Sequence, residues 1–184
     1  MDGKKYQIFF SSTFKDLEEE RHQAIEAILD LYCIPINMEY FPATDKKQID
    51  YIKMMLDDVD FIVLIIGNCY GSTDLEGVSY TEREFEYAIE NNIPILAFLY
   101  KDFVPKENKR KLKRFRERVC ADRVCKFWHT SNELKEQVVS SLANKICNNP
   151  PGGWVKAKDV DLYKLPPNIF FSEEEPTNAK EGDV

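Results

Sequence analysis

FIVLII, residues 61–66, is an uninterrupted apolar stretch near the middle of this 184-residue chain. A similar stretch, ILAFL, occupies residues 95–99. A strand with one face in water alternates apolar and polar residues, whereas a strand covered on both faces is apolar throughout. Both stretches are far shorter than the ~20 residues that a membrane-spanning helix needs. They therefore predict central strands of a parallel sheet that is buried on both sides.

Short β-rich runs alternate along the chain with apolar residues at helical spacing. Right-handed crossovers between parallel strands place helices above and below a sheet. The sequence thus predicts an α/β fold, a flavodoxin-like doubly wound five-stranded parallel sheet with strand order 2-1-3-4-5 and helices on both faces. The expected strands are residues 6–10, 36–41, 61–66, 94–100 and 124–128, and a helix is expected after each of them.

The periodic pattern ends near residue 148, where a stretch containing Pro and Gly follows. We expect one α/β domain over residues 1–148. Aromatic residues beyond it predict that residues 149–171 form a C-terminal extension that packs on the domain, and residues 172–184 are expected to be an acidic, disordered tail.

The amino-acid composition indicates which kinds of partner and which cellular compartment are expected. Hydrophobic residues make up 43% and charged residues 31% of the chain, which is typical of a globular protein. The net charge of -7 opposes binding to nucleic acid. Five cysteines, an odd number without a C-x-x-C pair, predict free thiols in a reducing compartment. We therefore expect a soluble, cytoplasmic protein with no membrane or nucleic-acid partner.

Two local patterns favour structural interpretations. Eight basic residues and two glutamates occupy residues 106–118, and Leu112, Phe115 and Val119 form one apolar stripe there. We interpret this segment as a solvated helix, with a surface for an anionic partner as the alternative. The C-x4-C-x3-H spacing of Cys120, Cys125 and His129 lacks an evident fourth ligand, so core thiols are favoured over a zinc site and no metal is expected.

The candidate site follows from the topology, because doubly wound sheets bind ligands at the carboxyl ends of their strands where the strand order reverses. Strand one ends in Ser11, Ser12 and Thr13. At a helix N-terminus these residues would favour an anion such as phosphate. Strand three leads into Asn68 and the run Tyr70-Gly71-Ser72, where Gly71 would allow close approach of a ligand and Tyr70 would stack on a ring. The plainer alternative is that these residues cap a helix and form a turn.

The helix expected over residues 80–91 adds an acidic candidate. Thr81, Glu84 and Ala88 share one face by their spacing, so Glu84 points towards the switch point of the sheet. Four glutamates in this helix are equally typical of a solvated surface, and position alone distinguishes Glu84 from the others.

These segments resemble a known family. KYQIFFSS (residues 5–12) resembles the opening strand and loop of Toll/interleukin-1 receptor (TIR) domains, and DFIVLIIGNCYG (residues 60–71) resembles their third strand and the loop after it. FFSSTFKDLEEER (residues 9–21) and GVSYTEREF (residues 77–85) resemble the TIR-related domain of unknown function found at the N-terminus of NACHT and repeat proteins. The resemblance covers about residues 5–147. The Trp-Cys pair usual before the TIR glutamate is replaced here by Glu82-Arg83.

The resemblance implies an NAD-processing enzyme, an NAD glycohydrolase or ADP-ribosyl cyclase, with NAD as the substrate and no further cofactor. Glu84 falls at the position of the catalytic glutamate of TIR domains. Its carboxylate would stabilise positive charge on the ribose as the nicotinamide–ribose bond breaks. Attack by water would give ADP-ribose, and attack by the adenine would give a cyclic isomer. Substrate-binding residues are then expected at Ser11, Ser12, Thr13, Asp45, Asn68, Tyr70, Gly71 and Thr81. Asp16 is expected to be a helix-start acid and Arg21 a partner for a buried carboxylate.

Three functions remain in competition. Small TIR-like proteins of Thoeris-type antiphage systems suggest a producer of a signal, read by a separate effector protein. The missing Trp-Cys pair and the basic segment 106–118 favour instead a non-catalytic assembly module that works through self-association. The spacing Thr81-x-x-Glu84-x-x-Tyr87-Ala88 is similar to that of nucleoside 2-deoxyribosyltransferases and favours an N-glycosidase acting on nucleosides or nucleotides.

Overall fold

Five parallel strands form one sheet in the order β2-β1-β3-β4-β5, which confirms the predicted flavodoxin-like topology. The computed structural model describes residues 4–14, 16–37, 48–148, 150–156 and 160. The chain divides into two compact units, residues 1–154 and 155–184, and the sheet belongs to the first. The strands are β1 (Gln7–Ser12), β2 (Ile34–Ile36), β3 (Phe61–Ile66), β4 (Ile95–Tyr100) and β5 (Lys126–Trp128).

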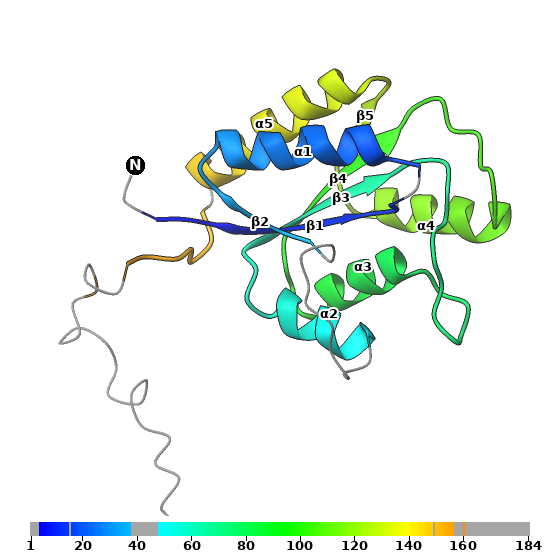
Figure 1. The fold of residues 1–184 in the computed structure, drawn as a ribbon, viewed down its shortest axis with the longest axis horizontal. Coiled ribbons are helices and arrows are strands. Elements are labelled where there is room, and N and C mark those ends of the chain that lie inside the picture. Colours follow the sequence, from blue (N-terminus) through cyan, green and yellow to red (C-terminus); the bar gives the residue numbers. More distant parts are fainter. Residues whose placement is uncertain (1–3, 15, 38–47, 149, 157–159, 161–184) are drawn as a thin grey trace, which may run out of the picture. The chain divides into compact units, whose positions relative to one another are not determined.

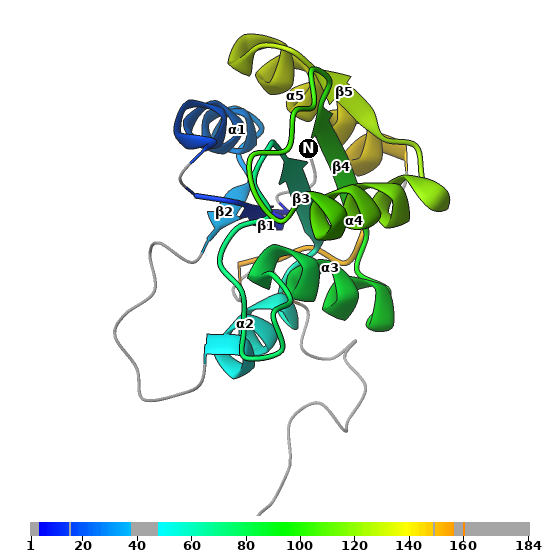
Figure 2. The same cartoon turned by 90° about the vertical axis from the view of Figure 1, so that its right-hand side faces the viewer.

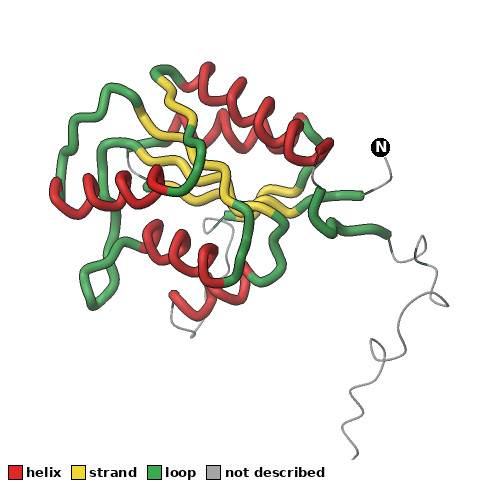
Figure 3. The backbone as a smooth tube through the Cα atoms, turned by 180° about the vertical axis from the view of Figure 1, so that it is seen from behind, coloured by secondary structure: helices red, strands yellow, loops and turns green. Residues whose placement is uncertain are grey.

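Helices cover both faces of this sheet (Figure 1). The helices α1 and α5 lie together on one face, and α2, α3 and α4 lie on the other, as the side view shows (Figure 2). Seen from behind, the sheet lies between two layers of helix (Figure 3). The helices are α1 (Glu18–Asp30), α2 (Gln48–Leu56), α3 (Tyr80–Glu90), α4 (Lys109–Ala121) and α5 (Ser131–Asn148).

The central strand β3 contributes side chains to two hydrophobic cores. All six of its residues are buried. Phe61, Val63 and Ile65 pack in the core beneath α1 and α5, whereas the intervening residues pack in the core beneath α2, α3 and α4. This alternation is the two-residue period of a strand, and it explains why an uninterrupted apolar stretch is required at this position.

The first strand is longer than predicted. Ser11 and Ser12 continue β1, because they pair with Leu64 and Ile65 of β3. Helix α1 begins only at Glu18, and among the described residues its N-cap, Leu17, has no side-chain capping hydrogen bond. The expectation that residues 11–13 cap a helix is therefore wrong, because Ser11 and Ser12 belong to the sheet and Thr13 to the loop after it. Binding of an anion by these residues stays a prediction.

Smaller differences concern the other boundaries. The second strand is Ile34–Ile36 rather than 36–41, and residues 38–47 lie outside the described part of the chain. The stripe of α4 is confirmed, because Leu112, Phe115 and Val119 are all buried.

Residues 153 and 154, at the start of the predicted extension, form hydrogen bonds with residues that precede β1 and β3. Trp154 and Lys5 exchange two backbone hydrogen bonds, of 2.7 and 2.8 Å. The backbone N–H of Gly153 donates to Asp60 Oδ1 at 3.0 Å. The packing of the remaining extension and the acidic tail stays a prediction, because residues 157–159 and 161–184 lie outside the described part of the chain.

Candidate functional site

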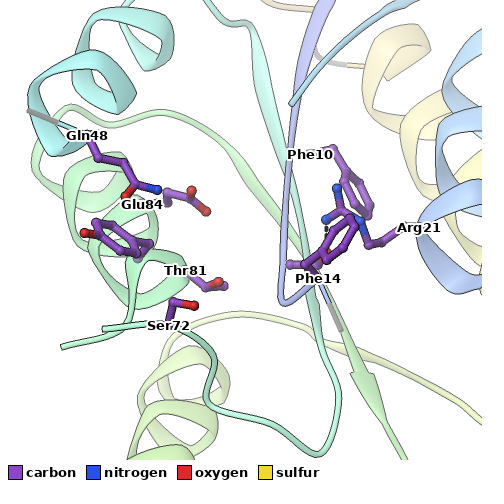
Figure 4. Close-up of a pocket in the computed structure, with 9 residues that line it drawn as sticks. Phe10, Phe14, Arg21, Gln48, Ser72, Thr81 and Glu84 are labelled. Atoms are coloured by element: carbon purple, nitrogen blue, oxygen red, sulfur yellow. Dashed lines mark hydrogen bonds between the residues drawn. The ribbon is translucent and has the colours of Figure 1, made fainter. Parts of the chain in front are cut away.

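A pocket of about 240 Å³ lies at the carboxyl end of β1. Side chains from β1, the loop after it and α1 form one wall, and α2, α3 and the loop before α3 form the other (Figure 4). This is the switch-point position that the predicted topology indicates for a ligand. The lining residues are Phe10, Ser12, Phe14, Arg21, Gln48, Ser72, Tyr80, Thr81 and Glu84.

Local hydrogen bonds fix the start of α3 against the pocket. The side chain of Ser79 caps the helix by accepting a hydrogen bond from the backbone N–H of Glu82 at 3.1 Å. The backbone N–H of Tyr80 donates to the carbonyl of Ser72 at 3.1 Å. A serine that satisfies a free N–H of the first turn stabilises a helix start. The face carrying Thr81, Glu84 and Ala88 is buried, as predicted from their spacing.

Glu84 is the central acidic group of the pocket. It is only 4% exposed, and Ser11 Oγ donates a hydrogen bond to Glu84 Oε2 at 2.5 Å. Burial raises the pKa of the Glu84 carboxyl to about 8, because the charged form loses its hydration. The Ser11 hydrogen bond and the positive charge of Arg21 both act to lower this pKa, but burial outweighs them.

Arg21 provides the cation of the opposite wall. Its side chain is 7% exposed, and Nη1 donates to Ser12 Oγ at 2.6 Å. The guanidinium carbon lies 5.0 Å from the ring centroid of Phe10 and 5.4 Å from that of Phe14. The two rings therefore hold the guanidinium in place from within the pocket wall. A buried carboxyl and a buried guanidinium thus line one small pocket. This arrangement suits a ligand that carries a positive group and a negative group.

The structure brings some of the predicted site residues together and separates others. Ser12, Thr81 and Glu84 line the pocket, and Ser11 contacts Glu84. The sequence interpretation missed Phe10, Phe14, Gln48 and Tyr80. Gln48 and Phe14 carried no usable signal, because the fold alone brings them to the pocket that Glu84 lines. Arg21 was assigned as a partner for a buried carboxylate, and its charge does act on Glu84.

Thr13, Asp16 and Gly71 link two loops. Thr13 Oγ1 donates to Asp16 Oδ1 at 2.5 Å, and Asp16 Oδ2 accepts the backbone N–H groups of Asn68 and Cys69 at 3.2 and 3.0 Å. Gly71 has a φ of +85°, and a Cβ there would lie 2.8 Å from Thr13 Cγ2. Asp16 therefore binds the loop after β3 instead of starting α1, which corrects the expectation for this residue.

Tyr70 and Asn68 lie away from the pocket. Tyr70 is 2% exposed, and its hydroxyl donates to Glu82 Oε2 at 2.5 Å. Its ring packs in the core beneath α3 and α4, so it offers no face for stacking on a ligand, and that expectation is wrong. Asn68 lines a separate hollow of about 180 Å³ beside His129. Asp45 lies outside the described residues.

The basic helix α4 is partly anchored. Arg116 donates to the carbonyls of Ile66 and Tyr100, and Arg118 pairs with Glu82 and Glu86. These bonds, together with the buried stripe, confirm a structural helix with a charged outer face. An anionic partner for that face stays a prediction.

The described residues carry neither a metal-ligand cluster nor a membrane-spanning helix. Across 4–14, 16–37, 48–148 and the short stretches after them, no three His, Cys, Asp or Glu side chains are grouped to hold a metal ion. Cys120 and Cys125 pack against the core beneath α4, and burial raises the pKa of the Cys125 thiol to about 12. Within the same described residues, no helix combines the length and the apolar character needed to cross a bilayer.

Comparisons with known proteins give a family and a distant structural likeness. No curated protein matches the chain in sequence. Among solved structures, the chain is similar to the TIR domains of the activated Roq1 resistosome, which directly recognises the pathogen effector XopQ. The identity is 12% and the TM-score 0.42, over 76% of this chain and 84% of that one. Residues 7–143 match the family described as Domain of unknown function (DUF4062), and because this match covers well over half of the chain, the protein belongs to that family.

Proposed function

We propose that this protein cleaves the bond between nicotinamide and ribose in NAD, as an NAD glycohydrolase or ADP-ribosyl cyclase. The observation that carries the proposal is the buried Glu84 carboxyl, which lines a pocket at the switch point of the sheet opposite a guanidinium. Its position matches the catalytic glutamate of the TIR domains that the sequence resembles. A titratable group with a strongly shifted pKa in a pocket is a candidate for catalysis.

The reaction needs one carboxylate. The C1′–N bond breaks and its electron pair moves to the pyridinium nitrogen, so that neutral nicotinamide leaves without being protonated. Positive charge then develops on C1′ and the ring oxygen of the ribose. An ionised Glu84 stabilises that charge in a site of low dielectric, more strongly in the transition state than in the ground state.

A nucleophile completes the reaction. Water attacks C1′ and loses a proton, which gives ADP-ribose. An adenine nitrogen of the same substrate, folded back onto C1′, gives a cyclic ADP-ribose when water is excluded. Such a product would serve as a signal in antiphage immunity, read by a separate effector protein.

The raised pKa of Glu84 fits a cationic substrate. With the pocket empty, a pKa of about 8 keeps the carboxyl mostly protonated at neutral pH. A pyridinium substrate brings a positive charge next to this carboxyl, which lowers its pKa and favours the ionised form. On the opposite wall, Arg21 and Ser12 offer donors to the phosphates of the same molecule.

The test is incubation of the full-length protein with NAD, followed by chromatography with mass detection of nicotinamide and of each ADP-ribose species. Glu84→Gln keeps the shape and the acceptor for Ser11 but cannot ionise, so we expect nicotinamide release to fall about 10³-fold. Glu117→Gln, on the exposed side of α4, is the matched control and should keep full activity. Equal release by wild type and Glu84→Gln would contradict the proposal.

A second candidate, an N-glycosidase acting on neutral nucleosides or nucleotides, is favoured by the same pKa. A neutral base leaves more easily when it is protonated, and a carboxyl that holds its proton at neutral pH is suited to general acid catalysis. The two candidates differ in their pH profiles. Activity on NAD should rise with pH through the pKa of Glu84, whereas proton donation to a neutral base should weaken.

A further inference from the structure

A second hollow lies next to the Glu84 pocket. It measures about 630 Å³ and is formed by α2, α3 and the loop around residues 74–76. Gln48 and Tyr80 line both cavities, so the two are neighbours across a shared wall. Figure 4 shows Gln48 on the same side as Glu84, with Arg21 on the opposite wall. We call this second cavity the outer hollow.

The outer hollow carries an excess of negative charge. Its four acidic lining residues face only two basic ones, Lys53 and Arg83. Arg83 is already shared by three of the carboxylates, and Arg118, from outside the hollow, also pairs with Glu86. Within the described chain the exposed Glu90 has no ion pair, so the negative charge that is left over lies mainly there. The hollow therefore attracts a cation and repels a phosphate. The four acidic residues are Asp74, Glu76, Glu86 and Glu90.

Aromatic rings add a second feature suited to a planar cation. Tyr80 and Tyr87 both line the outer hollow. The Lys53 ammonium lies 5.7 Å from the Tyr87 ring centroid, so this surface already accepts a positive charge over a ring. Rings combined with nearby carboxylates recognise cations through their electron-rich faces and through charge attraction.

We propose that the outer hollow binds the cationic base of an N-ribosyl pyridinium, and so selects substrates whose leaving group is positively charged. The base lies beyond Gln48 and Tyr80, the ribose lies at Glu84, and the phosphates lie on the side of Arg21 and Ser12. This inference rests on the proposed function and adds to it an orientation of the substrate and a reason for its specificity.

The proposal assigns the acidic residues to binding rather than to the chemical step. The base is positive in the ground state and neutral after the C1′–N bond has broken, so the hollow holds the substrate more tightly than the released base. Interactions that weaken towards the transition state lower KM without raising kcat. Removing the carboxylates should therefore raise KM for NAD and leave kcat unchanged or slightly higher.

The experiment compares NAD with NADH, which differ in the charge of the nicotinamide ring and share the diphosphate and adenosine. Affinities are measured by isothermal titration calorimetry in the Glu84→Gln protein, in which turnover should be about 10³-fold slower. The test variant adds Glu76→Gln and Glu90→Gln, both at exposed positions where folding should be retained. The control adds Glu117→Gln and Glu136→Gln on α4 and α5, which changes the net charge equally.

We expect NAD to bind more tightly than NADH, and the ratio of their affinities to fall roughly two- to fivefold for each carboxylate removed. The control should keep the original ratio. A ratio that is the same in all three proteins would overturn this inference while leaving the proposed function intact, because NAD would still bind. Saturable binding of neither nucleotide, by these proteins or the wild type, would overturn both.

Discussion

Glu82 and Glu84 lie two residues apart in the first turns of α3, and both are buried, yet their surroundings differ. Glu82 is 1% exposed, and each of its carboxylate oxygens has a donor: Arg118 Nη1 on Oε1 and the Tyr70 hydroxyl on Oε2, both at 2.5 Å. Glu84 receives the Ser11 hydroxyl and lines a pocket, and burial raises its pKa to about 8.

The difference shows how one helix holds a structural carboxylate and a chemical one. Glu82, with a guanidinium and a phenol as partners, joins α3 to α4 and to the loop after β3. A carboxyl that is buried without an equally strong set of partners keeps its proton and changes charge when a cation arrives. Glu82 therefore anchors the helix beside Glu84.

The largest expected effect that distinguishes the two glutamates is the dependence of the free energy of unfolding on pH, which Glu84 should cause. The native state holds the Glu84 proton up to about pH 8, whereas an unfolded glutamate loses it near its ordinary value of 4.5. The contribution of the neutral carboxyl to the free energy of unfolding is therefore complete below about pH 4.5 and lost as the pH rises through about 8. We expect a decline on the order of 5 kcal/mol over this interval.

Urea unfolding of wild type and Glu84→Gln at a series of pH values measures this decline. The amide does not titrate, so the difference between the two proteins isolates Glu84 from the other carboxylates. Below about pH 4.5 the two should have similar stability; the difference should grow as the pH rises to about 8, and at pH 9 the variant should be the more stable. Parallel curves for the two proteins would show that Glu84 ionises normally in the native state.

Glu82→Gln should lower the free energy of unfolding, whereas Glu84→Gln should raise it at high pH. The amide cannot pair with the charge of Arg118, and the bonds between α3 and α4 weaken. Because Arg118 is 42% exposed and still contacts Glu86, it is not left without solvation, and we expect a loss of about 2 kcal/mol.

The midpoint of urea unfolding at pH 7 measures this loss, with Glu117→Gln on the exposed side of α4 as the control that should keep the wild-type midpoint. Nicotinamide release by folded Glu82→Gln should stay within a few-fold of wild type. A loss of activity as large as that of Glu84→Gln, in protein that is fully folded, would show that Glu82 belongs to the chemistry and would remove the distinction between the two residues.

The contrast also marks what the sequence could predict. The two-residue period of β3 and the helical spacing of Thr81, Glu84 and Ala88 are local patterns, so the sheet order, the buried faces and the direction of Glu84 could be predicted from them. The partners of Glu82 could not be predicted. Arg118 lies 36 residues further on and contacts Glu82 only once α3 and α4 have packed on the sheet. Tyr70 was misinterpreted for the same reason, since its hydroxyl is satisfied by Glu82 inside the core.

Two further residues show how pairing with a distant strand overrides local preference. Ser11 and Ser12 are typical helix caps, but hydrogen bonding to β3 holds them in β1 and places the Ser11 hydroxyl on Glu84. The pocket walls at Gln48 and Phe14 likewise depend on where α2 and the loop after β1 come to lie. Local patterns therefore predicted the catalytic candidate, and tertiary contacts selected its neighbours.

The smallest of these effects tests the Ser11 hydroxyl itself. Ser11→Ala removes the hydrogen bond that stabilises the ionised form of Glu84, so the pKa of the carboxyl should rise by about 1 unit, equivalent to about 1.4 kcal/mol. The increase of kcat/KM for NAD with rising pH should therefore shift to higher pH by the same amount. Well above that pKa, the activity should approach the wild-type value. Ser12→Ala, whose hydroxyl bonds to Arg21 instead, is the control and should leave the midpoint of the profile nearer its original pH. A uniform loss of activity at every pH in Ser11→Ala would mean that the serine acts on the substrate directly rather than through the pKa of Glu84.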